Sequence, residues 1–171
     1  MESYSSSKTL YKERNKVVQN FDVIHSVDSL KLAKEIDKRA KNIDKTMDIL
    51  VQINPADEES KFGVSLEEVR GLIKEILNTC ENVRIKGLMS VAPAVDNPED
   101  VKPYFERVNE KYDELASVDD PKLDFEYLSM GMSHDFMVAI ECGANIIRVG
   151  SAIFGERDYA QFRKEQEEKQ N

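Results

Sequence analysis

The chain has 171 residues, 40% of them hydrophobic and 33% charged, with a formal net charge of −9. Residues 1–50 carry a balance of +2, which leaves −11 for the remainder, and this argues against nucleic acid or an anionic membrane as the main partner. No apolar run has the length of a membrane span and the N-terminus lacks the apolar core of a signal peptide, so we expect a cytoplasmic protein.

Five apolar segments are predicted to form strands, and each is separated from the next by a segment with helical periodicity. In chain order the predicted strands are Phe21–His25, Met47–Ile53, Val83–Val91, Phe125–Met130 and Asn145–Val149.

Helix start signals stand between these strands. Ser29 precedes the first apolar stripe, and Ser65 with Glu68 forms a capping box before the second. Asn97 and Pro98 combine a capping residue with a proline at the first helical position. Strands and helices are therefore expected to alternate.

This alternation predicts the α/β class, with about five βα units of parallel sheet wrapped by helices. A closed β/α barrel takes eight strands, so we expect a partial (β/α) TIM-type barrel over residues 15–159. A flexible polar N-terminus, residues 1–14, would precede it, and a polar tail, residues 160–171, would follow. The open sheet edges would need cover from a homodimer or a partner chain.

The two cysteines, Cys80 and Cys142, each lie on the apolar side of a predicted helix. We expect them to be small buried hydrophobic residues in a reducing compartment. With two histidines and no paired Cys/His spacing, the sequence gives no support for a metal site.

Two segments near the C-terminus share one pattern. Leu128–Asp135 and Asn145–Gly155 each consist of a buried strand, a Gly/Ser turn and the start of a helix. Unpaired N–H groups at a helix start suit an anion, and in β/α barrels the loops after the last two strands most often hold phosphate. The sequence therefore predicts a site for a phosphorylated small molecule.

Small residues in these two turns are the first candidate ligands. Ser133 is expected to be the N-cap of the helix that follows it, to contact a bound anion, or both. Gly131 and Gly150 either relax tight turns or let a ligand approach the backbone. Ser151 adds a hydroxyl at the second helix start.

Arg148 lies inside an apolar strand, where a charge must reach solvent or find a partner. A ligand atom or a core carboxylate would supply one. His25, at the carboxyl end of another strand, either contacts a ligand or is a hydrogen-bonded structural histidine. Met89 lies at a third strand end.

Together these segments resemble the pyridoxal phosphate homeostasis proteins (YggS-type), which share the barrel of the alanine racemase N-terminal domain. The resemblance runs from about Asn15 to Tyr159. The matching motifs are Ile24–Leu30, Glu58–Gly63, Lys86–Met89, Leu128–Ser133 with Asp135, and Arg148–Gly155.

The resemblance implies that the cofactor is pyridoxal 5'-phosphate (PLP). It implies that Ser133, Gly150 and Ser151 hold the phosphate, and that Arg148 and Met132 lie close to the cofactor. The full set of candidate cofactor-binding residues is Met132, Ser133, Arg148, Gly150, Ser151, Gly131, Met89 and His25.

One departure from the family concerns its Schiff-base lysine, which lies in earlier βα units that have no counterpart here. Ser7-Lys8-Thr9 copies the lysine's tripeptide without the apolar strand around it. We therefore expect a non-catalytic PLP-binding protein of vitamin B6 homeostasis that holds its cofactor non-covalently. A PLP-dependent racemase-like enzyme, and a truncated fragment that needs a partner chain, are the alternatives.

Overall fold

The computed structural model describes residues 3–4, 16–58 and 62–155. Their strands form a single parallel sheet in which spatial order follows chain order. The strands are β1 (Ser3–Tyr4), β2 (Val23–Val27), β3 (Met47–Ile53), β4 (Val83–Ser90), β5 (Leu123–Met132) and β6 (Ile146–Arg148). The five predicted strands are confirmed as β2 to β6, with ends that differ by up to two residues.

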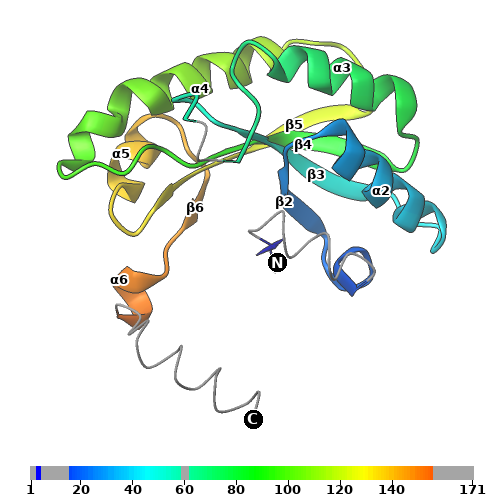
Figure 1. The fold of residues 1–171 in the computed structure, drawn as a ribbon, viewed down its shortest axis with the longest axis horizontal. Coiled ribbons are helices and arrows are strands. Elements are labelled where there is room, and N and C mark those ends of the chain that lie inside the picture. Colours follow the sequence, from blue (N-terminus) through cyan, green and yellow to red (C-terminus); the bar gives the residue numbers. More distant parts are fainter. Residues whose placement is uncertain (1–2, 5–15, 59–61, 156–171) are drawn as a thin grey trace.

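Helices follow the strands, as expected for βα units. They are α2 (Leu30–Lys41), α3 (Val69–Thr79), the 3-10 turn η1 (Pro98–Val101), α4 (Lys102–Ala116), α5 (Phe136–Glu141) and α6 (Ser151–Phe154). Figure 1 shows an arched sheet whose convex side is covered by α2, α3 and α4. The partial TIM-type barrel is therefore confirmed.

Period-two alternation along the strands separates two apolar clusters. Ile49, Val51 and Ile53 of β3 belong to the large core between the sheet and its helices. Leu50 points the other way and joins a smaller cluster with Met89, on the face that we call the inner face. Because both faces are buried in the middle of β3, Ile49, Leu50 and Val51 form an uninterrupted apolar run there.

The predicted helix starts are confirmed in their local hydrogen bonds. Ser29 Oγ accepts from the Leu32 amide at 3.4 Å. Ser65 Oγ accepts from the Glu68 amide at 3.2 Å and pairs with the Glu68 carboxylate at 2.9 Å, which completes the capping box. Asn97 likewise caps η1, and the α-helix proper begins four residues after Pro98.

β1 was not predicted. Ser3 and Tyr4 pair with Val23 and Ile24 in parallel register, inside the segment expected to be flexible. The rest of the N-terminal segment, including Ser7-Lys8-Thr9, and the tail from residue 160 lie outside the described residues, so expectations for them stay predictions.

Two further findings concern the described residues as a whole. None of their helices combines the length and the apolar character that a bilayer span requires. Cys80 and Cys142 are buried and unpaired, as expected, and burial raises the pKa of both thiols.

Candidate functional site

The candidate residues gather where β2, β4, β5 and β6 reach their carboxyl ends. The parallel register sets Met89 of β4 opposite Ser129 of β5, and Met132 of β5 opposite Arg148 of β6. In open parallel sheets ligands bind outside this edge. The sheet thus brings together residues that lie far apart in sequence; His25 and Ser129 are 104 positions apart.

Arg148 is held by oxygens of the two neighbouring strands. Its Nη1 donates to the Ser129 carbonyl at 3.0 Å and to Ser129 Oγ at 2.7 Å, and its Nη2 donates to the Ser90 carbonyl at 2.7 Å. Of the alternatives for Arg148, a core carboxylate is not the partner found among the described residues, because these three acceptors are uncharged. Burial lowers the pKa of Arg148, and the more distant charge of Asp135 acts in the opposite direction.

His25 meets the same serine from β2. Its Nδ1 lies 3.3 Å from Ser129 Oγ, which already accepts a hydrogen bond from Arg148. If the Ser129 hydroxyl hydrogen is donated to Nδ1, the proton of the neutral ring lies on Nε2. Burial, and then the charge of Arg148, lowers the pKa of His25 to about 4, so the ring is neutral at pH 7.

Two buried polar atoms near this network have no hydrogen-bond partner among the described residues. They are His25 Nε2, on the inner face, and Ser90 Oγ, which follows Met89 along β4 and therefore points toward the helices; their side chains are 2% and 0% exposed. A buried donor without an acceptor costs about 1–3 kcal/mol of stability. The inner face therefore contains one buried polar atom, His25 Nε2, that no described residue satisfies.

The two predicted Gly/Ser turns meet directly. Ser133 Oγ accepts hydrogen bonds from the Gly150 amide at 3.0 Å and from the Ala152 amide at 3.3 Å. The expectation that Ser133 caps its own helix is wrong: α5 begins at Phe136 with Asp135 at the N-cap position. Ser133 instead caps the start of α6 across the gap between the turns.

Asp135 fixes the shape of the first turn. Its carboxylate accepts from the Met132 amide at 2.6 Å, and its own amide donates to the Met132 carbonyl at 3.1 Å. Asp135 is only 6% exposed, so the turn is held by an acceptor that solvent barely reaches. Ser133 is thereby positioned to face the second turn.

The two glycines differ in what surrounds them. Gly131 has φ +93°, and a Cβ there would lie 2.6 Å from the Cβ of Ala139 in α5, so close packing alone requires glycine. A Cβ on Gly150 would meet no atom within 4 Å. The fold therefore explains the first glycine and leaves the second unexplained.

The remaining candidates lie at different depths. Met89 is buried in the small cluster of the inner face, and Met132 is 38% exposed at the rim. Ser151 is exposed in the second turn. The helices α5 and α6 have six and four residues, so the donors of the two turns act as individual groups rather than through helix dipoles.

Lys86 is a buried lysine toward the amino end of the inner face. Its Nζ lies 2.7 Å from the Asp124 carboxylate, 2.6 Å from the Glu126 carboxylate and 5.8 Å from the centre of the Tyr127 ring. Hydrogen bonds to both carboxylates raise its pKa, so the amine is a cation and a poor nucleophile.

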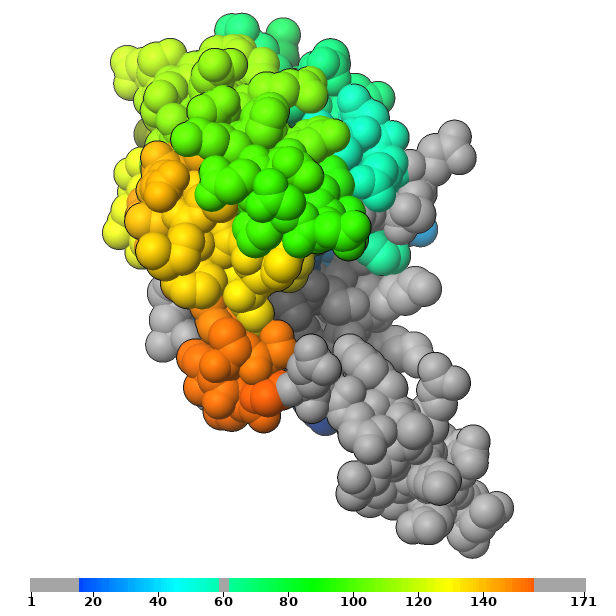
Figure 2. Space-filling view, turned by 90° about the vertical axis from the view of Figure 1, so that its left-hand side faces the viewer, coloured from blue at the N-terminus to red at the C-terminus, as the bar shows by residue number. Residues whose placement is uncertain are grey.

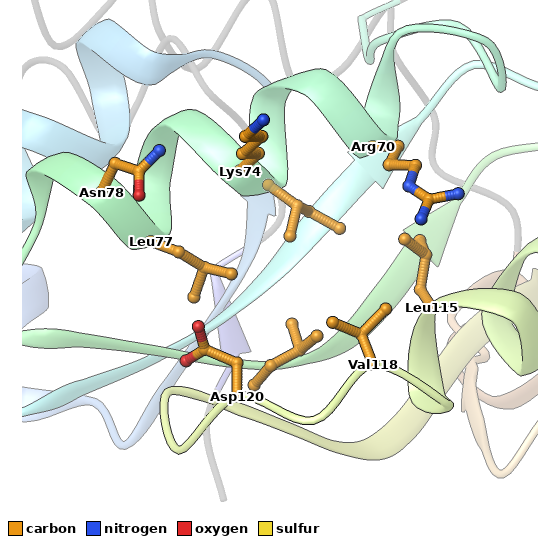
Figure 3. A pocket seen from close by; sticks show the side chains of 9 residues that line it. Arg70, Lys74, Leu77, Asn78, Leu115, Val118 and Asp120 are labelled. Carbon is orange, nitrogen blue, oxygen red and sulfur yellow. The ribbon is translucent and has the colours of Figure 1, made fainter.

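A groove of about 380 Å³ lies elsewhere, between α3 and the segment that joins α4 to β5. Figure 3 shows Leu77, Leu115 and Val118 around it, with Lys74 and Asp120 at its rim. None of the candidate residues lines this groove. In the described part of the chain, no cluster of three or more His, Cys, Asp or Glu side chains is arranged for a metal ion.

Sequence reasoning missed Ser129 and Ser90, which carry the network around Arg148. Strand alternation could have found Ser129, because Leu128 and Met130 face the helices and the serine between them must face inward. The role of the Ser90 carbonyl has no such signal, because any residue would supply that oxygen.

The fold and the site define a class of protein: a partial parallel βα barrel with a polar site at the carboxyl ends of its strands. The chain belongs to the family of the alanine racemase N-terminal domain, which it matches over residues 6–158.

Relatives with assigned names are pyridoxal phosphate homeostasis proteins. The one from Aquifex aeolicus is 46% identical over 137 residues, which is 80% of this chain and 59% of the relative. The one from Homo sapiens is 36% identical over 146 residues, which is 84% of this chain and 53% of the relative. The chain thus spans between half and two thirds of the length of these relatives.

Solved structures agree. PipY of Synechococcus elongatus without PLP is 30% identical with a TM-score of 0.75, covering 91% of this chain and 69% of that one. PipY with PLP bound is 31% identical with a TM-score of 0.72, covering 84% of this chain and 66% of that one.

Proposed function

We propose that this chain binds PLP at the carboxyl ends of β2, β4, β5 and β6 and serves vitamin B6 homeostasis as a non-catalytic protein. The observation that carries the proposal is the convergence of the two turns on Ser133 Oγ, beside the Arg148 network. The names of the relatives and the PLP-bound PipY structure support the choice of cofactor.

The residues present fit a phosphorylated ligand. Ser133 Oγ accepts two amide hydrogens and keeps its own hydrogen to donate, and Ser151 adds a second exposed hydroxyl. Open space beside Gly150 leaves room for a phosphate group. We assign Ser133, Gly150 and Ser151 to the phosphate.

The buried network fits the polar ring of the cofactor. Arg148 brings positive charge, and His25 Nε2 is a buried atom of the inner face that lacks a partner among the described residues. We assign Arg148, His25, Met89 and Met132 to the ring, with Gly131 shaping the turn between them. Bound PLP supplies an aldehyde and a phosphate dianion.

Lys86 is excluded from a covalent role in this proposal, because two carboxylates hold its amine as a cation. We therefore propose non-covalent binding by the described residues. A cytoplasmic location completes the proposal, since two buried, unpaired cysteines suit a reducing compartment.

Titration of the chain with PLP, followed by absorbance and calorimetry, tests this function. The Ser133→Ala variant removes the hydroxyl on which the turns converge, so we expect it to bind PLP about tenfold more weakly, a loss of about 1.4 kcal/mol. Its affinity for pyridoxal, which lacks the phosphate, is expected to stay unchanged. Ser117→Ala, which alters an exposed serine after α4, is the matched control.

Two results would contradict the proposal: calorimetry that detects no PLP binding to the unmodified chain, or equal PLP affinity of the Ser133→Ala and unmodified chains. Borohydride treatment with peptide mapping adds a separate measurement. It identifies any lysine that is linked to the cofactor, and we expect Lys86 to be unmodified.

A further inference from the structure

The groove between α3 and the segment that joins α4 to β5 has aliphatic walls, and we call it the α3 groove. Its volume of about 380 Å³ lies near the lower end of the range of about 300–1,000 Å³ that is typical of small-molecule sites. Its apolar lining consists of Ile73, Leu77, Leu115, Val118 and Leu123. No aromatic ring stands among the described residues that line it, so the groove suits an aliphatic group better than a stacked ring.

Part of this apolar lining is not covered by the fold. Ile73 and Leu115 are buried, but Leu77 is only partly buried and Val118 is 38% exposed. Figure 3 shows Leu77 and Val118 reaching into the space between α3 and the segment after α4. Water in the α3 groove therefore contacts apolar atoms, and an aliphatic group that displaced this water would bind favourably.

Polar contacts near both ends of α3 join it to the opposite wall of the groove. At the carboxyl end of the helix, Lys122 Nζ donates to the Leu77 and Cys80 carbonyls. At the amino end, Arg70 Nη1 lies 3.2 Å from the Glu114 carboxylate of α4. The two walls are thus held in place by the fold itself, and the α3 groove is formed before any ligand binds, as is usual for small-molecule sites.

The charged groups at the rim differ in whether they have partners. Arg70 is paired with Glu114, and the Asp120 carboxylate accepts a hydrogen bond from the Lys122 amide at 2.9 Å. The Lys74 ammonium group, one helical turn after Arg70, forms no hydrogen bond or ion pair with another residue that the structure describes. A cation beside the aliphatic walls is therefore available to an anion.

We propose that the α3 groove binds a small aliphatic monocarboxylate, whose chain lies against Leu77 and Val118 and whose carboxylate lies beside Lys74. A monoanion fits better than a phosphate dianion, because Lys74 is a single cation and Figure 3 shows the Asp120 carboxylate across the groove from it. The inference goes beyond PLP binding and does not depend on it.

The α3 groove is separate from the proposed PLP site. The described residues that line it include none of the candidate PLP-binding residues. In Figures 1 and 2, α4 lies toward the top of the molecule and α6, whose first residue belongs to the second Gly/Ser turn, lies well below it. We therefore expect the two ligands to bind independently.

Titration of the full chain with sodium octanoate tests the proposal, and NMR signals of leucine and valine methyl groups report where the octanoate binds. We expect saturable changes at Leu77 and Val118. Lys74→Glu should weaken octanoate binding about fivefold, because it replaces attraction with repulsion at an exposed position. The affinity of this variant for 1-octanol, which has the same chain length without the charge, should stay unchanged.

A second variant alters the apolar wall, and each variant has a matched control. Val118→Asp places a carboxylate in the wall and should weaken the binding of octanoate and of 1-octanol about tenfold. Ile43→Asp, at a similarly exposed position (40%) after α2, should weaken neither. Lys41→Glu repeats the charge change of Lys74→Glu at an exposed lysine of α2 and should leave octanoate affinity unchanged. All four changes affect exposed side chains, so each variant should keep its melting temperature.

Four results would overturn the inference. They are octanoate that changes no methyl signal of Leu77 or Val118, equal losses of octanoate affinity in Lys74→Glu and Lys41→Glu, equal losses of octanoate and 1-octanol affinity in Lys74→Glu, and equal effects of Val118→Asp and Ile43→Asp.

PLP affinity is measured separately, with and without saturating octanoate, which keeps the two proposals distinguishable. We expect the same PLP affinity in both conditions. A loss of PLP affinity in octanoate would mean that octanoate competes at the PLP site, and the inference of a second, independent site would then be wrong.

Discussion

The cationic side chains at the two ends of the inner face have different hydrogen-bond partners. At the amino end, Arg84 meets the Asp48 carboxylate through two hydrogen bonds of 2.9 and 3.0 Å, and Lys86 meets two carboxylates. At the carboxyl end, the acceptors of Arg148 among the described residues are hydroxyl and carbonyl oxygens. At the amino end, Arg84 and Lys86 are therefore paired with carboxylates. Arg148, at the carboxyl end, is not paired directly with a carboxylate of the described residues.

This difference in partners distinguishes side chains whose interactions stabilise the fold from side chains that are available to bind a ligand. Ion pairs at the amino end leave Lys86 and Arg84 with satisfied donors, so folding accounts for them. At the carboxyl end, His25 Nε2 is buried without a partner among the described residues, which folding alone disfavours. We infer that this cost persists because a ligand at the carboxyl end makes use of it.

The largest effect should come from acid, acting on His25. Its pKa is about 4 when folded and 6.5 in an exposed reference, so the unfolded chain binds the proton more tightly between these values. The stabilising contribution is complete above pH 6.5 and is lost as the pH falls to about 4. This amounts to at most about 3 kcal/mol. Urea unfolding at a series of pH values measures it.

The control for this prediction removes the buried ring itself. His25→Gln should flatten the dependence of the unfolding free energy on pH between about 4 and 6.5. The prediction is contradicted if the unfolding free energy of the unmodified chain does not change over that range. His25 would then not be buried as a neutral ring.

A second prediction compares the two arginines. Arg148→Ala leaves the Ser129 and Ser90 oxygens without their donors, so we expect a loss of about 2 kcal/mol in the free energy of unfolding. Arg84→Ala removes a partly exposed ion pair and should cost less than about 1 kcal/mol. Chemical denaturation of both variants without ligand measures the difference. Equal losses in the free energy of unfolding would mean that Arg148 and Arg84 stabilise the fold in the same way.

Much of the fold follows from local pattern. The apolar runs and start signals such as Ser29 and the Ser65–Glu68 box specify where strands and helices lie, because each depends on neighbours within a few residues. The same reasoning does not predict β1, because its two residues are not part of an apolar run and form a strand by pairing with β2.

The sequence predicts that the two Gly/Ser turns lie together after neighbouring strands, and the structure brings them together through Ser133. That these turns bind a ligand stays a prediction. Which helix Ser133 caps, and which oxygens receive Arg148, depend on the register between β4, β5 and β6. Register is a property of the assembled sheet, so no single segment of sequence contains it.

The smallest expected effects are changes in stability that distinguish the two turns at the carboxyl end of the sheet. Gly131→Ala puts a methyl group against α5 at a positive φ, so we expect it to lower the free energy of unfolding by more than about 1 kcal/mol. Gly150→Ala meets open space at φ −122°, so its stability should change by less than about 0.5 kcal/mol.

Ligand binding completes this comparison, because a residue that folding does not require is free to serve the ligand. Gly150→Ala should keep its melting temperature without ligand, yet gain less thermal stabilisation from added PLP than the unmodified chain, since the new methyl group occupies the space assigned to phosphate. Thermal unfolding with and without PLP measures both values. If Gly150→Ala gains as much from PLP as the unmodified chain does, the phosphate does not lie at the second turn.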